Sequence, residues 1–157
     1  MKFFLWAWLA VAPLSHAVEK QAVEKQSVED RPVEKTYGDV TITQVGTVYD
    51  GDTFFVSIEK WPAIAGDHIG VRVNGVDTPE MKGKCEREVS LARQAKQFTV
   101  GFLRNAKSIQ LKNLARDKYF RIVADVYADG KSLSQELIKN NLGYQYYGAT
   151  KKSWCDK

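Results

Sequence analysis

Residues 71–80 read Val71-Arg-Val-Asn-Gly-Val-Asp-Thr-Pro-Glu80, a strand that ends at a proline turn between two carboxylates, Asp77 and Glu80. The valines at its start share one face of the strand, and Arg72 points to the opposite face. Because the proline fixes its own φ and favours extended geometry in the preceding residue, both acids stand on a stiff corner. Upstream, Asp50-Gly-Asp-Thr53 predicts a second acidic turn, whose glycine would let the chain approach a ligand closely. Two acidic corners and an arginine favour a hard metal ion beside a phosphate.

Length and composition limit what the chain can be. Its 157 residues form one domain, or one domain with appendages, and 44% of them are apolar, which is enough for a core. The net charge of +4 and the pI of about 9.0 permit an anionic partner without requiring one.

The N-terminal segment, residues 1–17, has the organisation of a secretory signal. Met1-Lys2 is followed by an apolar run from Phe3 to Leu14 and a small-residue ending at Ala17. The run is shorter than the roughly 20 residues of a membrane span, so we expect cleavage after Ala17 and export to the periplasm or the medium. An uncleaved N-terminal anchor is the alternative. Residues 18–36 repeat a charged five-residue unit and predict a disordered tether before a folded domain at 37–157.

The chain contains two cysteines, Cys85 and Cys155. In an oxidising compartment an even pair predicts a disulfide, which would close a loop of about 70 residues and stabilise the fold by roughly 4 kcal/mol. Two free buried thiols are the alternative. A tetrahedral zinc site is not expected, because two cysteines without clustered histidines cannot complete its ligand shell.

The pattern beyond the tether predicts five strands and two helices. β-Branched residues and turn signals predict the first three strands, which form a meander, and apolar spacing of three and four predicts the helices. The expected elements are a strand at 40–49, broken or bulged near Gly46; strands at 54–58 and from Val71; a helix at 85–106; strands at 108–112 and 121–127; and a helix from Ser132 that stops in left-handed geometry at Gly143. This α+β order fits a small five-stranded barrel of the oligonucleotide/oligosaccharide-binding (OB) type.

The acids and arginines carry the expected chemistry. Asp52 and Asp77 each stand at a strand end in what should be one sheet, so they can converge on calcium, which accepts flexible oxygen ligands more readily than magnesium does. Glu80 could take a proton from water, and Arg72 and Arg121 could neutralise charge on a phosphoryl group. Any one of these residues alone would be read as a turn or surface residue. Together they favour a phosphodiester substrate.

Other catalytic arrangements are poorly supported. His16 falls in the expected signal and His68 stands alone, which argues against a serine–histidine hydrolase or an imidazole-based ribonuclease. Gly130-Lys-Ser132 imitates the end of a phosphate-binding loop, but Asp125 occupies the position of that motif's first glycine.

Four motifs, in order and with matching spacing from about Thr43 to Leu142, resemble the staphylococcal nuclease (thermonuclease) family. They are Thr47-Val-Tyr-Asp-Gly-Asp-Thr53, the run from Val71 to Glu80, Arg116-Asp-Lys-Tyr-Phe-Arg121 and Ala124-Asp-Val-Tyr-Ala-Asp-Gly130. Gly83-Lys-Cys85 and Ser153-Trp-Cys155 look like the cysteine-bearing branch of that family in Gram-negative bacteria.

The resemblance implies a calcium-dependent phosphodiesterase that acts on DNA and RNA and leaves 3′-phosphates. It assigns calcium to the following groups: Asp52, Asp77 and the carbonyl of Thr78, with Asp50 behind them. It assigns the substrate to the following side chains: Arg72 and Arg121 at the scissile phosphate, Glu80 as general base, and Lys118 and Tyr119 at the other phosphate or sugar. A glutamate at position 80 could instead orient water or hold a neighbour. The enzyme should act as a monomer without stable membrane association once the signal is removed.

Some features depart from the best-known members. Phe120 stands where a glycine is usual, so the loop that presents Arg121 should differ. The final helix should be absent, because the chain ends soon after Gly148, and a bond between the cysteines would pin the tail in its place. Tyr144, Tyr146 and Tyr147 could stack bases or pack on the barrel.

Two functional hypotheses other than a nuclease remain. One is a catalytically inactive nucleic-acid-binding OB module, although such modules typically lose an acid or an arginine that this chain retains. The other is a carbohydrate- or peptide-binding barrel, which would leave the set of acids and arginines unexplained.

Overall fold

The computed structural model describes residues 36–42 and 44–156. The predicted signal segment 1–17 and the tether, apart from its last residue, lie outside the described residues. All the described structure lies in one compact unit, Lys35–Lys157. Within the described part of the chain, no helix is both long and apolar enough to cross a membrane.

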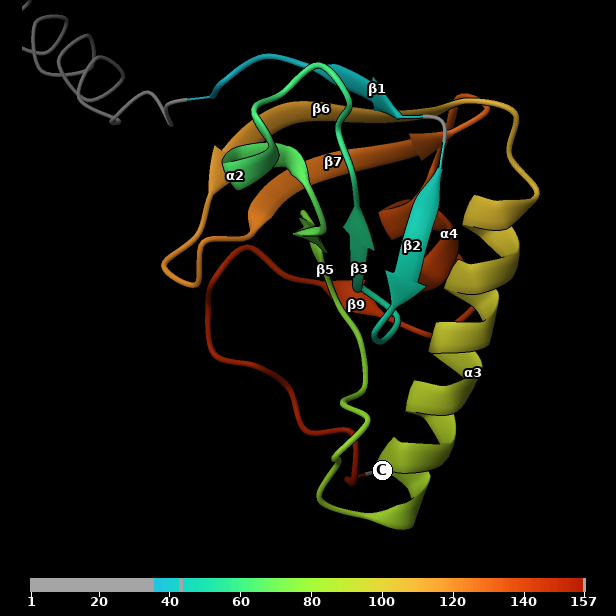
Figure 1. Cartoon of the computed structure of the whole chain (residues 1–157). Helices are drawn as coiled ribbons and strands as arrows, with labels where there is room; N and C mark the ends of the chain where they lie inside the picture. The colour runs from blue at the N-terminus through green and yellow to red at the C-terminus, as the bar shows by residue number, and fades with distance from the viewer. Residues whose placement is uncertain (1–35, 43, 157) are drawn as a thin grey trace, which may run out of the picture. The chain divides into compact units, whose positions relative to one another are not determined.

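One mixed sheet and one small ribbon form the β structure (Figure 1). The sheet has the order β1-β6-β7-β4-β3-β2, with β8 paired to β7, and the ribbon pairs β5 with β9. The strands are β1 Val40–Ile42, β2 Val45–Val48, β3 Thr53–Val56, β4 Ile69–Val73, β5 Val76–Asp77, β6 Ile109–Arg116, β7 Ile122–Ala128, β8 Lys131–Ser132 and β9 Tyr144–Gln145.

The strand order is that of a curled, barrel-like sheet. The two strands at its edges, β1 and β2, are consecutive in the chain, and β1 pairs with β6 while β2 pairs with β3. The meander β2-β3-β4 is antiparallel, and β4 pairs with β7 in parallel. The predicted α+β OB class is confirmed. The predicted first strand divides into β1 and β2, and β5 leaves the main sheet because Gly75 turns the chain in left-handed geometry (φ 78°).

The register of β4 determines which side chains reach the outer face of the barrel. Ile69, Val71 and Val73 point into the core, which is built largely from aliphatic side chains of the sheet and of helices α3 and α4. Each buried valine contributes roughly 1.5–3 kcal/mol. Gly70 and Arg72 therefore share the opposite face. A one-residue slip would reverse both sets, so the core fixes the direction of Arg72.

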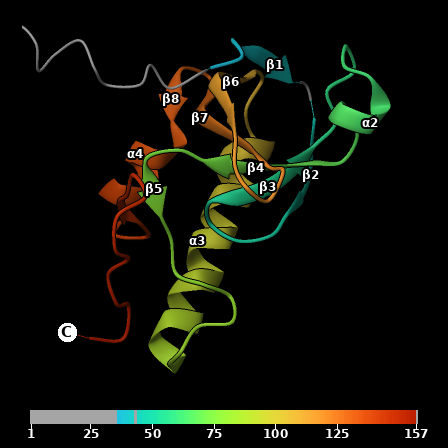
Figure 2. The ribbon, with the colours of Figure 1, turned by 90° about the vertical axis from the view of Figure 1, so that its left-hand side faces the viewer.

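Three helices lie in the described region: α2 Ala63–Gly66, α3 Glu86–Arg104 and α4 Leu133–Lys139. Helix α3 buries Ala92, Ala95, Thr99 and Leu103, whose spacing places them along one stripe. Figure 2 shows α3 running beside the strands, with α4 and α2 on different sides of the sheet. The one-turn helix α2, which the sequence pattern did not predict, forms in the loop after Pro62.

Helix α4 begins as predicted and ends differently. The Ser132 hydroxyl accepts a hydrogen bond from Gln135 N at 3.5 Å, as expected of an N-cap. The expected left-handed stop at Gly143 is wrong, because Asn141 takes that conformation (φ 57°). Gly143 is required for space instead: a Cβ there would lie 2.5 Å from Val76 Cγ2.

Candidate active site

The first acidic corner, at residues 50–53, is a tight turn that buries two carboxylates. Asp50 Oδ1 accepts a hydrogen bond from Asp52 N at 3.0 Å. Asp52 Oδ2 accepts two further bonds, from the backbone N and the hydroxyl of Thr78, both at 2.9 Å. The two acidic corners are therefore joined directly, and Asp50 holds the backbone of Asp52.

Gly51 is enclosed by the protein. A Cβ at this position would lie 2.8 Å from Ala95 Cβ and 2.9 Å from Thr78 Cβ, while Thr99 Oγ1 donates to the Gly51 carbonyl at 2.6 Å. The glycine is needed because helix α3 and the second corner both pack against the turn. The expectation that it allows a ligand to approach is corrected.

Arg72 connects the two corners through its guanidinium. Nη1 lies 2.9 Å from Asp52 Oδ2, and Nη2 lies 3.4 Å from Asp77 Oδ1. Nη1 also donates to the Val73 carbonyl at 3.0 Å. Asp77 reaches this point from β5, which pairs with β9. The expectation that Asp52 and Asp77 stand in one sheet is therefore wrong, although the two side chains do meet at Arg72.

The C-terminal tail supplies a second cation to the cluster. Lys151 Nζ lies 2.8 Å from Asp77 Oδ1 and 2.9 Å from Glu80 Oε1. The Tyr144 hydroxyl lies 2.8 Å from Asp77 Oδ2. Asp77 is 2% exposed, whereas the Glu80 side chain is 52% exposed. Glu80 therefore lies at the solvent edge of the cluster, where it can reach a water molecule.

Burial disfavours the ionised form of both acids in the first corner. It raises the pKa of Asp50 to about 7, with a further contribution from the charge of Asp52. Burial also raises the pKa of Asp52, although Arg72 and the hydrogen bonds from Thr78 act in the opposite direction.

The groups around Asp77 respond to its charge. Burial and the hydrogen bond to Asp77 raise the pKa of Tyr144 to about 12. Burial alone would lower the pKa of Lys151, but its bonds to Asp77 and Glu80 outweigh burial and raise it. The ammonium of Lys151 is therefore held as a cation between two carboxylates.

These residues fit a hard divalent cation. The predicted ligands Asp52, Asp77 and Thr78 offer only oxygen atoms, as calcium and magnesium prefer. Burial disfavours ionisation of Asp52, and the Lys151 ammonium stands against Asp77 where positive charge is favourable. A different group within the described residues, Cys85, Glu88 and Cys155, also brings possible ligand atoms together. Its two sulfurs bond to each other, so they provide no thiolate ligands.

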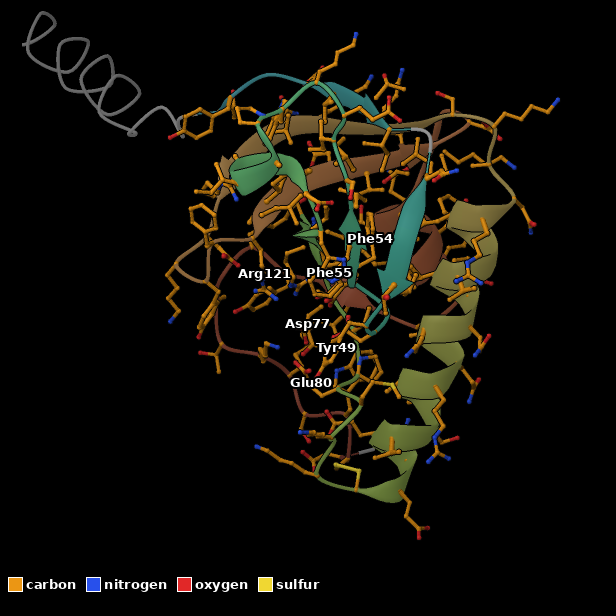
Figure 3. All side chains as sticks on the ribbon, in the orientation of Figure 1. Tyr49, Phe54, Phe55, Asp77, Glu80 and Arg121 are labelled. Atoms are coloured by element: carbon orange, nitrogen blue, oxygen red, sulfur yellow. A yellow bond between two sulfur atoms is a disulfide. The ribbon has the colours of Figure 1, made fainter. Side chains whose placement is uncertain are left out.

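Arg121 lies outside the carboxylate cluster and is held by its own loop. Its Nε lies 2.7 Å from Asp117 Oδ2, and its backbone N donates to Asp117 Oδ1 at 2.9 Å. A Cβ built on Gly70 would lie 3.3 Å from Arg121 Cγ, so the arginine crosses the outer face of β4, the face that carries Arg72 two residues later. Arg121, Asp77 and Glu80 accordingly follow one another down one side of the strands in Figure 3.

Lys118 and Tyr119 lie in the same loop and face solvent. Tyr119 is 69% exposed; the Lys118 ammonium lies 5.1 Å from its ring centroid and the Arg121 guanidinium lies 5.5 Å from it. Neither residue contacts the carboxylate cluster. Phe120 has φ 65°, so the loop retains the left-handed geometry that a glycine would adopt easily.

The predicted disulfide between Cys85 and Cys155 is confirmed. It ties the tail to the residue before helix α3, and residues 146–156 form no helix, as expected. The buried Glu88 accepts hydrogen bonds from Lys84 N at 2.7 Å and Glu80 N at 3.4 Å. The segment between the second acidic corner and α3 is therefore held by the disulfide and by the hydrogen bonds to Glu88.

Three residues of the site were not assigned a role from sequence: Glu88, Asp117 and Lys151. Asp117 precedes Arg121 by four residues inside a recognised motif, which is a signal for an ion pair. Tyr144 stacks on Trp154 with 4.9 Å between ring centroids, so it packs rather than lying open for a base. No sequence signal distinguishes Lys151 from the lysine beside it.

An OB-type barrel with two joined acidic corners and two arginines on one face defines a protein suited to a metal ion and a phosphodiester. Residues 70–155 match the family model described as "Staphylococcal nuclease homologue", and the chain belongs to that family. Members of this family generally depend on a metal ion.

Two relatives from Bacillus subtilis (strain 168) carry the word endonuclease in their names. "Endonuclease YncB" is 36% identical over 97 residues, which cover 54% of this chain and 46% of the relative. "SPbeta prophage-derived endonuclease YokF" is 34% identical over 97 residues, which cover 54% of this chain and 32% of the relative. The matched region thus spans less than half of either relative.

Proposed function

We propose that this chain is a calcium-dependent nuclease that hydrolyses phosphodiester bonds of DNA and RNA and leaves 3′-phosphates. The observation that carries the proposal is the guanidinium of Arg72, which contacts Asp52 and Asp77 from two distant corners. The family and the endonuclease names of the two relatives support the same reaction class.

The chain's own residues have separable tasks in this reaction. Arg72 and Arg121 bind the scissile phosphate and stabilise the charge that develops on its oxygens. Glu80, at the solvent edge, accepts a proton from the attacking water, while the bond from phosphorus to the 5′-oxygen breaks and that oxygen takes a proton from solvent. Asp52, Asp77 and the Thr78 carbonyl would hold the calcium ion, which would polarise the phosphodiester. Lys151 must release Asp77 and Glu80 before both carboxylates serve these roles.

The proposal includes export. The N-terminal sequence supports cleavage after Ala17 and release to the periplasm or the medium. The disulfide agrees with an oxidising compartment. Fractionation of expressing cells, followed by mass measurement of the mature chain, tests this part separately from catalysis. A chain that keeps residues 1–17 in the cytoplasm would contradict it.

The deciding experiment incubates the purified mature chain with plasmid DNA and with RNA, first with calcium and then with excess chelator. Cleavage is expected with calcium alone. The matched control is Arg121→Gln, which should bind calcium normally and cleave poorly. Activity that persists in chelator would remove calcium from the proposal, and binding without cleavage would favour an inactive nucleic-acid-binding module.

The position of bond breakage is tested on a labelled oligonucleotide. A product that ends in a 3′-phosphate cannot be extended by a polymerase until a phosphatase has treated it. Extension without phosphatase treatment would show that the other ester bond is broken.

A further inference from the structure

The outer face of the barrel contains a second feature beside Arg121, an open hollow of about 570 Å³. It is lined by Phe55, Ile69, Gly70, Tyr119, Phe120 and Arg121. We propose that this hollow is a nucleobase-binding subsite, in which a base of the bound strand lies against Phe55 and Phe120 while the adjoining phosphate lies on Arg121. The inference deepens the proposed nuclease function and rests on it.

Gly70 forms the floor of the subsite. It pairs with Phe55 across β3 and β4, and a Cβ added to it would lie 3.3 Å from Arg121 Cγ and 3.5 Å from Phe55 Cε1. The missing side chain therefore lets an aromatic ring and a guanidinium stem approach the same point of the sheet. A ligand in this place meets an apolar surface and a positive charge together, as one nucleotide requires.

The two rings of the subsite are each supported by a flat neighbour. The Phe55 ring stacks on His68, with 4.6 Å between centroids and 8° between planes. The Arg116 guanidinium carbon lies 4.2 Å from the Phe120 ring centroid, and Arg116 Nη1 donates to the Phe120 carbonyl at 2.8 Å. Both rings line the hollow while these partners hold them in place. Less conformational freedom is then lost when a base binds.

Neither burial nor backbone preference accounts for a phenylalanine at position 120. Its side chain is 63% exposed, so it adds little to the core. Its φ of 65° is unfavourable for a bulky residue. Arg116 contacts this ring, yet the ring still lines the hollow beside Arg121, where a ligand can reach it. The surrounding charges of Arg116, Lys118 and Arg121 favour an anionic one.

A nucleobase fits this chemistry because every base has an apolar π-face, whichever strand carries it. Stacking on an aromatic side chain strengthens binding by about 5- to 150-fold, the equivalent of about 1–3 kcal/mol. The same contact does not distinguish DNA from RNA. The subsite therefore adds affinity for unpaired bases without imposing a sequence.

The test compares two labelled strands with equal numbers of phosphates, a short oligothymidylate and an abasic strand. Both are titrated with calcium present into the Glu80→Gln form of the chain, chosen so that strands are bound rather than cleaved. We expect the base-bearing strand to bind about 5- to 150-fold more tightly. Phe120→Ala should remove most of this preference, and Phe120→Trp should preserve it. Phe120→Gly, which relieves the strain and so folds at least as well, should also lose it.

The control is Ile64→Ala, because Ile64 is 94% exposed on α2 and lines none of this hollow. It should leave the preference unchanged. In a chain with Glu80 intact, Phe120→Ala should raise KM for oligothymidylate by the same factor. Equal affinity for both strands, or a preference retained by Phe120→Ala, overturns the subsite while plasmid cleavage continues. Base-dependent binding without any cleavage would instead refute the nuclease and leave the subsite standing.

Discussion

The two arginines of the site are held in opposite ways. Arg72 lies on strand β4 with its side chain 15% exposed, and carboxylates from two distant corners bind it. Arg121 lies at the end of a loop with its side chain 33% exposed, and Asp117 of the same loop is its ion-pair partner. The first arginine is part of the carboxylate cluster, whereas the second can be changed without touching that cluster. Two residues with the same expected task should therefore differ in what else depends on them.

The largest expected effects come from Arg72→Gln and Arg121→Gln. Both should lower turnover by about 10²–10³-fold or more, because each removes a donor to charge that develops in the transition state. Only Arg72→Gln should also lower Tm in the absence of calcium, since it leaves the buried Asp52 without its ion-pair partner, whereas Asp77 keeps Lys151. Thermal denaturation with and without calcium, combined with kinetics, measures both effects.

Calcium should restore part of the Tm of Arg72→Gln by binding the folded state alone. An equal loss of Tm in both variants would show that the two arginines contribute alike to stability. Near-native turnover in either variant would contradict its assigned role at the phosphate.

The next largest effect concerns the tail on the Arg72 side of the site. Replacing both Cys85 and Cys155 by serine should lower the free energy of unfolding by about 4 kcal/mol, because the disulfide closes a long loop. Denaturant unfolding measures the loss, and reduction of the unchanged chain provides the matched comparison. A loss of well under 1 kcal/mol would mean that other contacts of the tail already supply its order.

Asp117→Asn changes the surroundings of Arg121 without touching the carboxylate cluster. The substitution weakens the ion pair that orients Arg121, so kcat/KM should fall about tenfold to a hundredfold while calcium affinity stays the same. Calorimetric titration with calcium and kinetics on one substrate separate these quantities. A matching fall in calcium affinity would show that the two sides of the site are coupled.

The same variant makes a prediction about pH. Partial burial alone would raise the pKa of Asp117, but hydrogen bonds from Arg121 and Tyr119 outweigh it and lower the pKa from 3.8. The ionised carboxylate thus stabilises the folded chain above pH 3.8, and this contribution is lost as the pH falls through the lowered pKa. The difference in Tm between the unchanged chain and Asp117→Asn should shrink below about pH 4.

Lys151→Ala should give the smallest effect, a rise of a few-fold to about tenfold in calcium affinity, because it removes a cation that competes for Asp77 and Glu80. Calorimetric titration measures the change without reference to cleavage. Lys152→Ala is the matched control, since that lysine lies over the Tyr144 ring and should leave calcium affinity unchanged. Equal behaviour of the two variants would exclude competition by Lys151.

The parts of the site that depend on local chemistry could be predicted from the sequence. A few adjacent residues determine the Asp50–Thr53 turn and the proline corner at Asp77. Alternation along β4 sets the direction of Arg72. The disulfide followed from the number of cysteines and the expected compartment. These features depend on short-range geometry, so a pattern in the chain predicts them.

Long-range packing decided what the sequence did not predict. Tyr144 contacts Asp77 because β9 pairs with β5, and Lys151 contacts it because the tail is tied back at Cys155. The left-handed residue after α4 is Asn141. Gly143 is required for a different reason, since a Cβ there would clash with Val76. In each case the outcome depends on a contact with a residue far away in the chain, or on the space that surrounding residues leave.

Gly51 carries no functional group, yet the separation of the carboxylates depends on it. A methyl group there would press on Ala95 and Thr78 together, and would disturb the bond from Thr99 to the turn. In a saturation-mutagenesis screen scored for cleavage, position 51 should therefore be as intolerant as a catalytic residue. Its intolerance would report the fit of helix α3 against an acidic turn, and Ala95→Gly, which removes the Cβ on the helix, should restore part of the cleavage.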